Sequence, residues 1–197
     1  MTATVALVKA RPGPGEIAAN AAKILDYARR ADRLGAAVTV FPESMLGGIG
    51  PDDPGAGDDL RRRGDEALTT LARTLDREGL GGRHVVVGAT ATGAADRPVS
   101  AAAVLHKGKV ALAWAGSDSP AEAVFAASGR RFGLATGGPP RRGQDGVDAI
   151  LVLARGVAYV TDGSGHVISQ PPAGHEGLTL WLAGGENDRR RDERLGG

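Results

Sequence analysis

One carboxylate stands out as a side chain that could do chemistry. Glu43 follows a short apolar run at residues 38–41 and a proline. A run of this kind predicts a buried strand that stops at the proline. Open α/β sheets usually bind their ligands at the carboxyl ends of such strands. Glu43 is therefore the first candidate for a general base or a substrate-binding acid.

The residues before Glu43 predict a βαβ unit that delivers this strand. Residues 4–10 alternate in polarity as a strand does, and apolar residues recur at helical spacing from 16 to 34. Gly35 suits the end of that helix. Because connections of this length join neighbouring strands, we expect the strands at 4–10 and 38–41 to pair in parallel.

The rest of the chain predicts one more helix and then mainly strands. Residues 47–57 have loop composition, and residues 60–78 have helical spacing. Helices in the N-terminal part of the chain and strands in the C-terminal part predict a sheet-rich α/β sandwich with α+β character, not a doubly wound Rossmann fold. We expect one domain over 1–184 and a charged, disordered tail over 185–197. The expected later strands are 84–89, 101–106, 109–114, 123–127, 131–135, 149–153, 157–161, 166–170 and 178–182.

Composition excludes several classes of function. The chain has 24 basic and 23 acidic residues among its 197, so a net charge of +1 gives no electrostatic case for nucleic acid or an anionic membrane. It has no cysteine, which removes a thiol nucleophile, a thiolate metal site and disulfides. No apolar window approaches a membrane span, and the N-terminus has no signal-peptide pattern. We expect a soluble, cytoplasmic protein.

Other polar residues do not assemble into a known site. No phosphate-binding glycine pattern precedes a helix, so we predict no cofactor. The hydroxyls of Ser100 and Thr136 could replace a nucleophile, but neither has a histidine beside it in the sequence. The four histidines lack metal-ligand spacing and occupy different predicted elements, so we predict no metal: His84, His106, His166 and His175.

An ordered series of stretches resembles the nitrilase, or carbon–nitrogen hydrolase, superfamily, and most of all the glutamine-amidase domain of glutamine-dependent NAD synthetases. Phe41-Pro42-Glu43 is similar to the signature that ends the first βαβ unit of the family. Later stretches occur in the family order: LGGIGPDDP, HVVVGATATG, GRRFGLATG, GVDAILVLA and VTDGSGHVISQPP. The resemblance runs from Val5 to about Trp181. It implies a four-layer α-β-β-α sandwich and chemistry on amide or nitrile carbon.

That chemistry needs a thiol nucleophile, a carboxylate base and a lysine that holds the oxyanion. The resemblance places the base at Glu43, the lysine position at Gly116 and the nucleophile position at Gly137. For the auxiliary acid of the family, Glu122 is the only nearby candidate. The chain is also shortened: residues 139–146 replace a helix after the nucleophile strand, and residues 154–156 replace a long active-site segment.

These departures predict a truncated, catalytically degenerate nitrilase-like protein in which Glu43 is a remnant of the general base. Such a protein would act as a non-catalytic scaffold or regulatory partner of an intact homologue, in a homo- or hetero-oligomer. The alternative from the enzyme class is an amidohydrolase or amide-transfer enzyme with reassigned chemistry around Glu43. It predicts a closed pocket with a basic residue within hydrogen-bond reach of Glu43. A third alternative is a decaying gene product, or one that folds only with a partner.

Overall fold

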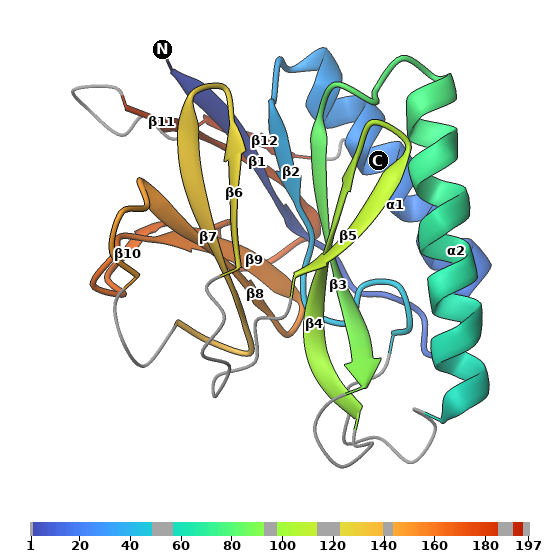
Figure 1. Cartoon of the computed structure of the whole chain (residues 1–197). Helices are drawn as coiled ribbons and strands as arrows, with labels where there is room; N and C mark the ends of the chain where they lie inside the picture. Colours follow the sequence, from blue (N-terminus) through green and yellow to red (C-terminus); the bar gives the residue numbers. More distant parts are fainter. Residues whose placement is uncertain are drawn as a thin grey trace.

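The computed structural model describes residues 2–48, 57–92, 98–113, 123–139, 144–184 and 191–194. They form two β-sheets and two helices (Figure 1). The helices are α1 (Ile17–Arg33) and α2 (Asp58–Arg77). The strands are β1 (Ala3–Lys9), β2 (Val38–Val40), β3 (His84–Thr92), β4 (Pro98–His106), β5 (Lys109–Ala113), β6 (Val124–Ala127), β7 (Arg130–Thr136), β8 (Ala149–Ala154), β9 (Val157–Thr161), β10 (Val167–Ser169), β11 (Gly177–Ala183) and β12 (Arg191–Arg194).

The larger sheet has seven strands in the order β12-β11-β1-β2-β3-β4-β5, and the smaller has five in the order β10-β9-β8-β7-β6. The predicted βαβ opening is confirmed, because β2 pairs in parallel with β1, with Val38 opposite Val5. On its other side β2 pairs in parallel with β3, where Val38 lies opposite His84. The strand that leads to Glu43 therefore lies inside the sheet, buried on both faces.

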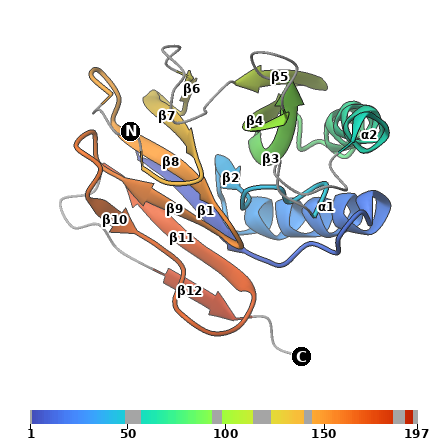
Figure 2. The same cartoon turned by 90° about the horizontal axis from the view of Figure 1, so that it is seen from below.

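The two faces of the larger sheet bury different side chains, because side chains alternate along a strand. On β1, Ala6 and Val8 face the helices, whereas Val5 and Leu7 face the smaller sheet. Figure 2 shows α1 and α2 on the side of the larger sheet that faces away from the smaller one. Both cores are made largely of Ala, Val and Leu, which suits the close spacing of these layers.

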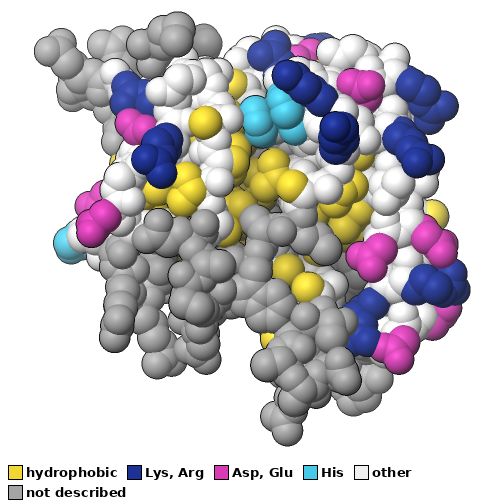
Figure 3. Space-filling view, in the orientation of Figure 1, with side chains coloured by type: hydrophobic (Ala, Val, Ile, Leu, Met, Phe, Trp, Pro, Cys, Tyr) yellow, Lys and Arg dark blue, Asp and Glu magenta, His cyan; other side chains and the backbone are white. Residues whose placement is uncertain are grey.

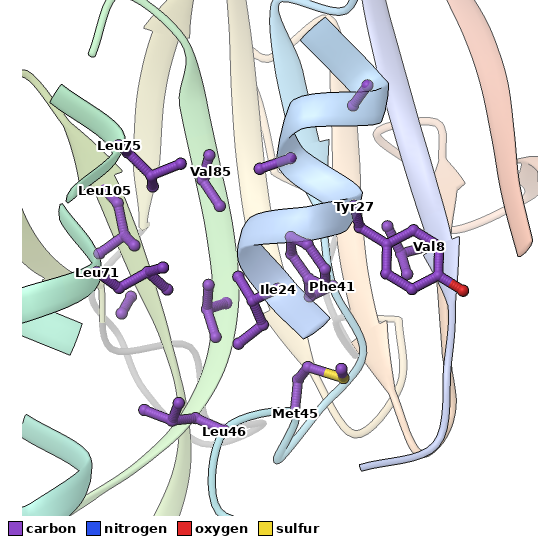
Figure 4. Packing of buried hydrophobic residues seen from close by; sticks show 14 of the residues in the cluster. Val8, Ile24, Tyr27, Phe41, Met45, Leu46, Leu71, Leu75, Val85 and Leu105 are labelled. Atoms are coloured by element: carbon purple, nitrogen blue, oxygen red, sulfur yellow. The ribbon is translucent and has the colours of Figure 1, made fainter. Parts of the chain in front are cut away.

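The helices hold the first core together through large apolar side chains. From α1, Ile24 and Tyr27 are buried, and the Tyr27 ring meets Phe41 edge-on with 6.2 Å between ring centroids (Figure 4). From α2, Leu71 and Leu75 are also buried. Burying one such leucine stabilises the fold by roughly 2 kcal/mol. Phe41 is held in this core, and Glu43 follows it by two residues.

The expected α-β-β-α sandwich is present in its sheets and its first helical layer, as the truncated nitrilase-like fold requires. Within the described residues no helix covers the outer face of the smaller sheet. There, Ile150 and Val152 are buried, and the Gln144 side chain lies against Gly133. Gln144 and Val147, which precede β8, therefore lie against this face, and residues 140–143 lie outside the described part.

Part of the expected disordered tail takes a defined form. Arg191–Arg194 pairs antiparallel with β11 as the edge strand β12, with Arg194 opposite Gly177. Residues 185–190 and 195–197 lie outside the described part of the chain, and the disorder expected of the tail stays a prediction. A single domain over 1–184 stays a prediction. In the described regions, neither helix has an apolar stretch long enough to cross a membrane.

Candidate functional site

Glu43 lies where the chain passes from one sheet to the other. Phe41 still belongs to the larger sheet, because its N–H donates to the Val86 carbonyl at 2.8 Å. Two residues later, the Glu43 N–H donates to the Ala154 carbonyl at the end of β8, at 3.0 Å. Glu43 also forms an isolated parallel bridge with Arg155. The backbone of the candidate acid thus joins the two sheets.

The smaller sheet presents a very short hairpin to Glu43. Strands β8 and β9 are joined by Arg155 and Gly156 alone, with Ala154 paired to Val157. The resemblance implied a long active-site segment here, and the predicted shortening is present in the structure. The hairpin end therefore lies directly against the Glu43 backbone.

A glycine in β3 makes room for this turn. A Cβ on Gly88 would contact the Pro42 carbonyl oxygen and would lie 2.6 Å from Ser44 N and 2.7 Å from Glu43 Cα. Ser44 has a φ of 55°, which is unusual for a residue other than glycine. The backbone over residues 42–44 is therefore pressed onto β3 and sharply turned. Glycine inside a strand often marks such a close approach, so the sequence did contain this signal.

The Glu43 carboxylate has one hydroxyl group beside it, and a second hydroxyl bonds to the residue that carries the first. The Ser100 hydroxyl, on β4, donates a hydrogen bond to Glu43 Oε1. The Thr136 hydroxyl, at the end of β7, donates to the Ser100 carbonyl at 3.4 Å. The structure therefore brings together Glu43 and both of the hydroxyl residues considered from the sequence. Glu43 and Ser100 are partly buried, and Thr136 is buried.

No described basic residue completes this group. The ion pairs found among the described residues lie elsewhere, and none includes Glu43. Nearby backbone donors are also in use: the Glu43 N–H is bonded to Ala154, and the Gly137 N–H donates to the Leu153 carbonyl at 2.9 Å. A developing oxyanion next to Glu43 would therefore find neither of these N–H groups available.

The position that the sequence resemblance gives to the nucleophile carries no side chain. Gly137 follows Thr136 directly, is exposed and has a φ of 76°, a conformation that favours glycine. The other two positions carried over from the resemblance, Gly116 and Glu122, lie outside the described residues. The structure thus places two of the four predicted positions, Glu43 and Gly137, near each other at the facing ends of β2 and β7.

A buried asparagine, which the sequence reading did not single out, braces the loop after Glu43. Asn20 of α1 is only 2% exposed. Its amide donates to the Gly13 carbonyl at 2.8 Å and the Leu46 carbonyl at 2.9 Å, and its Oδ1 accepts from the Gly13 N–H at 2.8 Å. These bonds tie the β1–α1 loop to residues 44–48. A polar residue on the buried stripe of a predicted helix was the available signal.

Space for a substrate is small on the helix side of this turn. A cavity of about 30 Å³ lies between Leu46, Leu60 and Ala89. A volume of this size holds little more than a water molecule. Among the described residues, no group of three His, Asp or Glu side chains is gathered closely enough to hold a metal ion.

Solved structures share this fold. The glutamine-dependent NAD⁺ synthetase from Acinetobacter baumannii, in complex with ADP, superposes with a TM-score of 0.70 over 92% of this chain, at 16% sequence identity. An amidase from Nesterenkonia sp. superposes with a TM-score of 0.65 over 90% of this chain, at 15% identity. The chain spans only 45% of the synthetase, but it corresponds to 89% of the amidase.

The Nesterenkonia amidase belongs to the nitrilase superfamily. One of its structures shows the Michael addition of acrylamide at the active site cysteine, and it covers 90% of this chain with a TM-score of 0.64. No protein-family model matches the chain, and no curated protein sequence matches it. The resemblance seen in the sequence is therefore confirmed as a shared fold, and this chain has no cysteine with which to repeat that addition.

Proposed function

We propose that this chain is a catalytically degenerate member of the nitrilase superfamily that acts without hydrolysing amides. The observation that carries the proposal is the absence of a side chain at residue 137. At the position that the family resemblance gives to the nucleophile, the chain has a glycine in a left-handed conformation whose N–H is bonded to Leu153. Thiol-dependent amide chemistry has no starting atom there.

The surroundings of Glu43 support the same proposal. Its carboxylate accepts the Ser100 hydroxyl, and its backbone N–H is used by the β8–β9 hairpin. The first contact gives a carboxylate at this place a structural role, because it pairs the partly buried Ser100 hydroxyl. The loss of pocket wall next to it, where Arg155 and Gly156 form the whole connection, removes the surface that would hold a substrate.

Amidase assays of the purified full chain test the first part of the proposal. Glutamine, asparagine and simple aliphatic amides are the substrates, and ammonia release is the measurement. We expect no turnover above buffer. Turnover that survives stringent purification, disappears in Glu43→Gln and persists in the control Glu66→Gln would overturn the proposal. Glu66 is an exposed acid on α2, so its change removes a carboxylate without touching the site.

A chain of this kind would serve as a scaffold or regulatory partner of an intact nitrilase-superfamily homologue, in a homo- or hetero-oligomer. The retained sheets and first helical layer support this role, since they can present a family-like surface without family chemistry. Co-expression with an intact homologue from the same host, followed by sedimentation velocity of the mixture, tests it. A mixed species of defined stoichiometry is expected. Two chains that sediment independently would contradict the partnership.

The second candidate function is a hydrolase in which Glu43 activates Ser100. The hydrogen bond between their side chains favours it, because a hydroxyl beside a carboxylate can pass its proton to that base. The Ser100 oxygen would bond to the amide carbon, and Glu43 would return the proton to the leaving amine. A water molecule would then hydrolyse the acyl-serine.

Two observations weigh against this second candidate. The described residues provide no basic side chain at Glu43, and the N–H groups of Glu43 and Gly137 are already bonded. Labelling with a fluorophosphonate, read out by intact-protein mass spectrometry, tests it directly. Stoichiometric labelling that Ser100→Ala abolishes would favour the hydrolase, whereas an unlabelled wild-type chain would exclude a reactive serine.

A further inference from the structure

A second cavity lies at the far end of the sandwich, away from Glu43. It has a volume of about 290 Å³ and lies where β3, β4 and β5 of the larger sheet face β6 and β7 of the smaller one. Ser100 and His106 are six residues apart on β4, so this cavity is roughly 20 Å from the Glu43 carboxylate. Its walls are apolar, formed by Val104, Ala111, Val124 and Leu134.

A stack of aromatic rings forms one side of this cavity. The His84 and His106 rings are nearly parallel, with 3.9 Å between centroids and an interplanar angle of 8°. Phe125 also stacks against His84, with 5.2 Å between centroids and an interplanar angle of 29°. Figure 3 shows histidine side chains at the surface with hydrophobic side chains gathered beside them, over the region between the two sheets. The stack offers ring edges and faces to a flat molecule.

The polar atoms of these histidines are open to a ligand. His106 Nδ1 lies 3.2 Å from the Arg83 carbonyl, which can only accept, so this nitrogen carries the proton and Nε2 is left for another partner. No hydrogen bond to the His84 ring is found among the described residues. Burial, together with His106 and Lys107, lowers the pKa of His84 to about 4, so its ring is neutral near pH 7 and still presents one N–H donor.

The charges around the cavity favour an anion. Lys109 lines it from β5, and Lys107 lies in the adjoining turn. None of the described residues that line it is acidic. Arg83 is paired with Asp32, at 2.8 Å. One acid, Asp76 of α2, lies against Gly108 in the β4–β5 turn, from the helix side of the sheet.

We propose that this cavity binds a small planar aromatic carboxylate. The ring lies against Phe125 and the two imidazoles, and the carboxylate accepts hydrogen bonds from Lys109 and a histidine N–H. The size of the cavity fits this class, because 290 Å³ is at the lower end of ligand pockets. The site shares no residue with the Glu43 region, so a test of this proposal is independent of the proposed function.

Benzoate binding to the full chain tests the proposal. Histidine imidazole resonances are followed at about pH 7.5 in long-range ¹H–¹⁵N spectra. The chain has only four histidines, and the exposed His166 and His175 serve as internal controls. We expect saturable shifts of His84 and His106 only, with a dissociation constant on the order of 1 mM for a ligand of this size.

Matched variants and ligands make the result decisive. Lys109→Met should weaken benzoate binding about tenfold, since a hydrogen bond to a charged group is lost. Arg73→Met removes one exposed positive charge from α2 and should leave the affinity unchanged. Benzylamine, which has the same ring and the opposite charge, should not saturate. Any of three results would overturn the proposal. The His84 and His106 shifts could rise linearly with benzoate concentration, benzylamine could shift them equally, or Lys109→Met could bind benzoate with unchanged affinity.

Discussion

Replacing Gly88 with alanine tests how the chain is held at Glu43. The new Cβ would lie 2.6 Å from Ser44 N and 2.7 Å from Glu43 Cα. Real Cβ atoms essentially never come closer than 3.0 Å to such atoms. Both are backbone atoms, so no side-chain rotation can relieve the contact. The turn over residues 42–44 has to move away from β3.

The cost follows from what that movement disturbs. Adding one methyl group to a packed interior typically costs 1–3 kcal/mol, and rigid backbone neighbours place this case at the upper end. The bonds from Phe41 N to Val86 and from Glu43 N to Ala154 would lengthen as the turn lifts. We therefore expect Gly88→Ala to lose about 3 kcal/mol or more of unfolding free energy. For a domain of this size, that lowers Tm by about 6–12 °C.

Urea unfolding followed by far-UV circular dichroism measures this loss, and Gly64→Ala is the matched control. Gly64 lies inside α2, and a Cβ there would have no neighbour within 4 Å. Alanine is better than glycine in a helix by about 1 kcal/mol, so the control should be stabilised and Tm should rise by about 2–4 °C. A Gly88→Ala variant as stable as the wild type would refute the close approach of Glu43 to β3.

The other stability predictions concern His84 and Asn20. Burial, with His106 and Lys107 nearby, lowers the pKa of His84 from 6.5 to about 4. The unfolded chain therefore binds this proton first as the pH falls, and stability drops through that window. Between about pH 7.5 and pH 5 we expect the unfolding free energy of the wild type to fall by about 1–2 kcal/mol more than that of His84→Gln. This figure is reduced to allow for the partly exposed ring. Equal pH dependence of the two proteins would contradict the prediction. Asn20→Leu should lower the unfolding free energy in urea by about 3 kcal/mol, because the backbone groups of Gly13 and Leu46 lose their hydrogen-bond partner. A variant of unchanged stability would show that the Asn20 hydrogen bonds do not hold these loops.

Much of the fold follows from local patterns in the sequence. Alternating and helical spacing predicted both helices and the positions of most strands, because burial on one face or two determines these patterns directly. Short turns are also readable in the sequence, since Lys107-Gly108 and Ser128-Gly129 lie between antiparallel strands. The parallel pairing of β1 with β2 followed from the handedness and length of the connection.

The contacts at the site could not be predicted in the same way, because they join segments far apart in the chain. No local pattern states that Ser100 of β4 reaches Glu43, or that Ala154 of β8 accepts its N–H. These contacts depend on how one sheet lies on the other, which is decided by the packing of both cores. Gly88 and Asn20 are intermediate cases, since each breaks a local rule that signals a contact but not its partner.

The contacts of Glu43 give this acid a structural role that does not depend on any reaction. The N–H of Glu43 joins the two sheets, its carboxylate satisfies the partly buried Ser100 hydroxyl, and its Cα lies over Gly88. Loss of the carboxylate would leave that hydroxyl without this acceptor, which carries a cost independent of any reaction. Residue 137 has no comparable contact, because nothing lies within 4 Å of a Cβ there, and its φ of 76° favours glycine. Glu43 thus has a structural reason to remain a carboxylate, whereas no described contact calls for a side chain at residue 137.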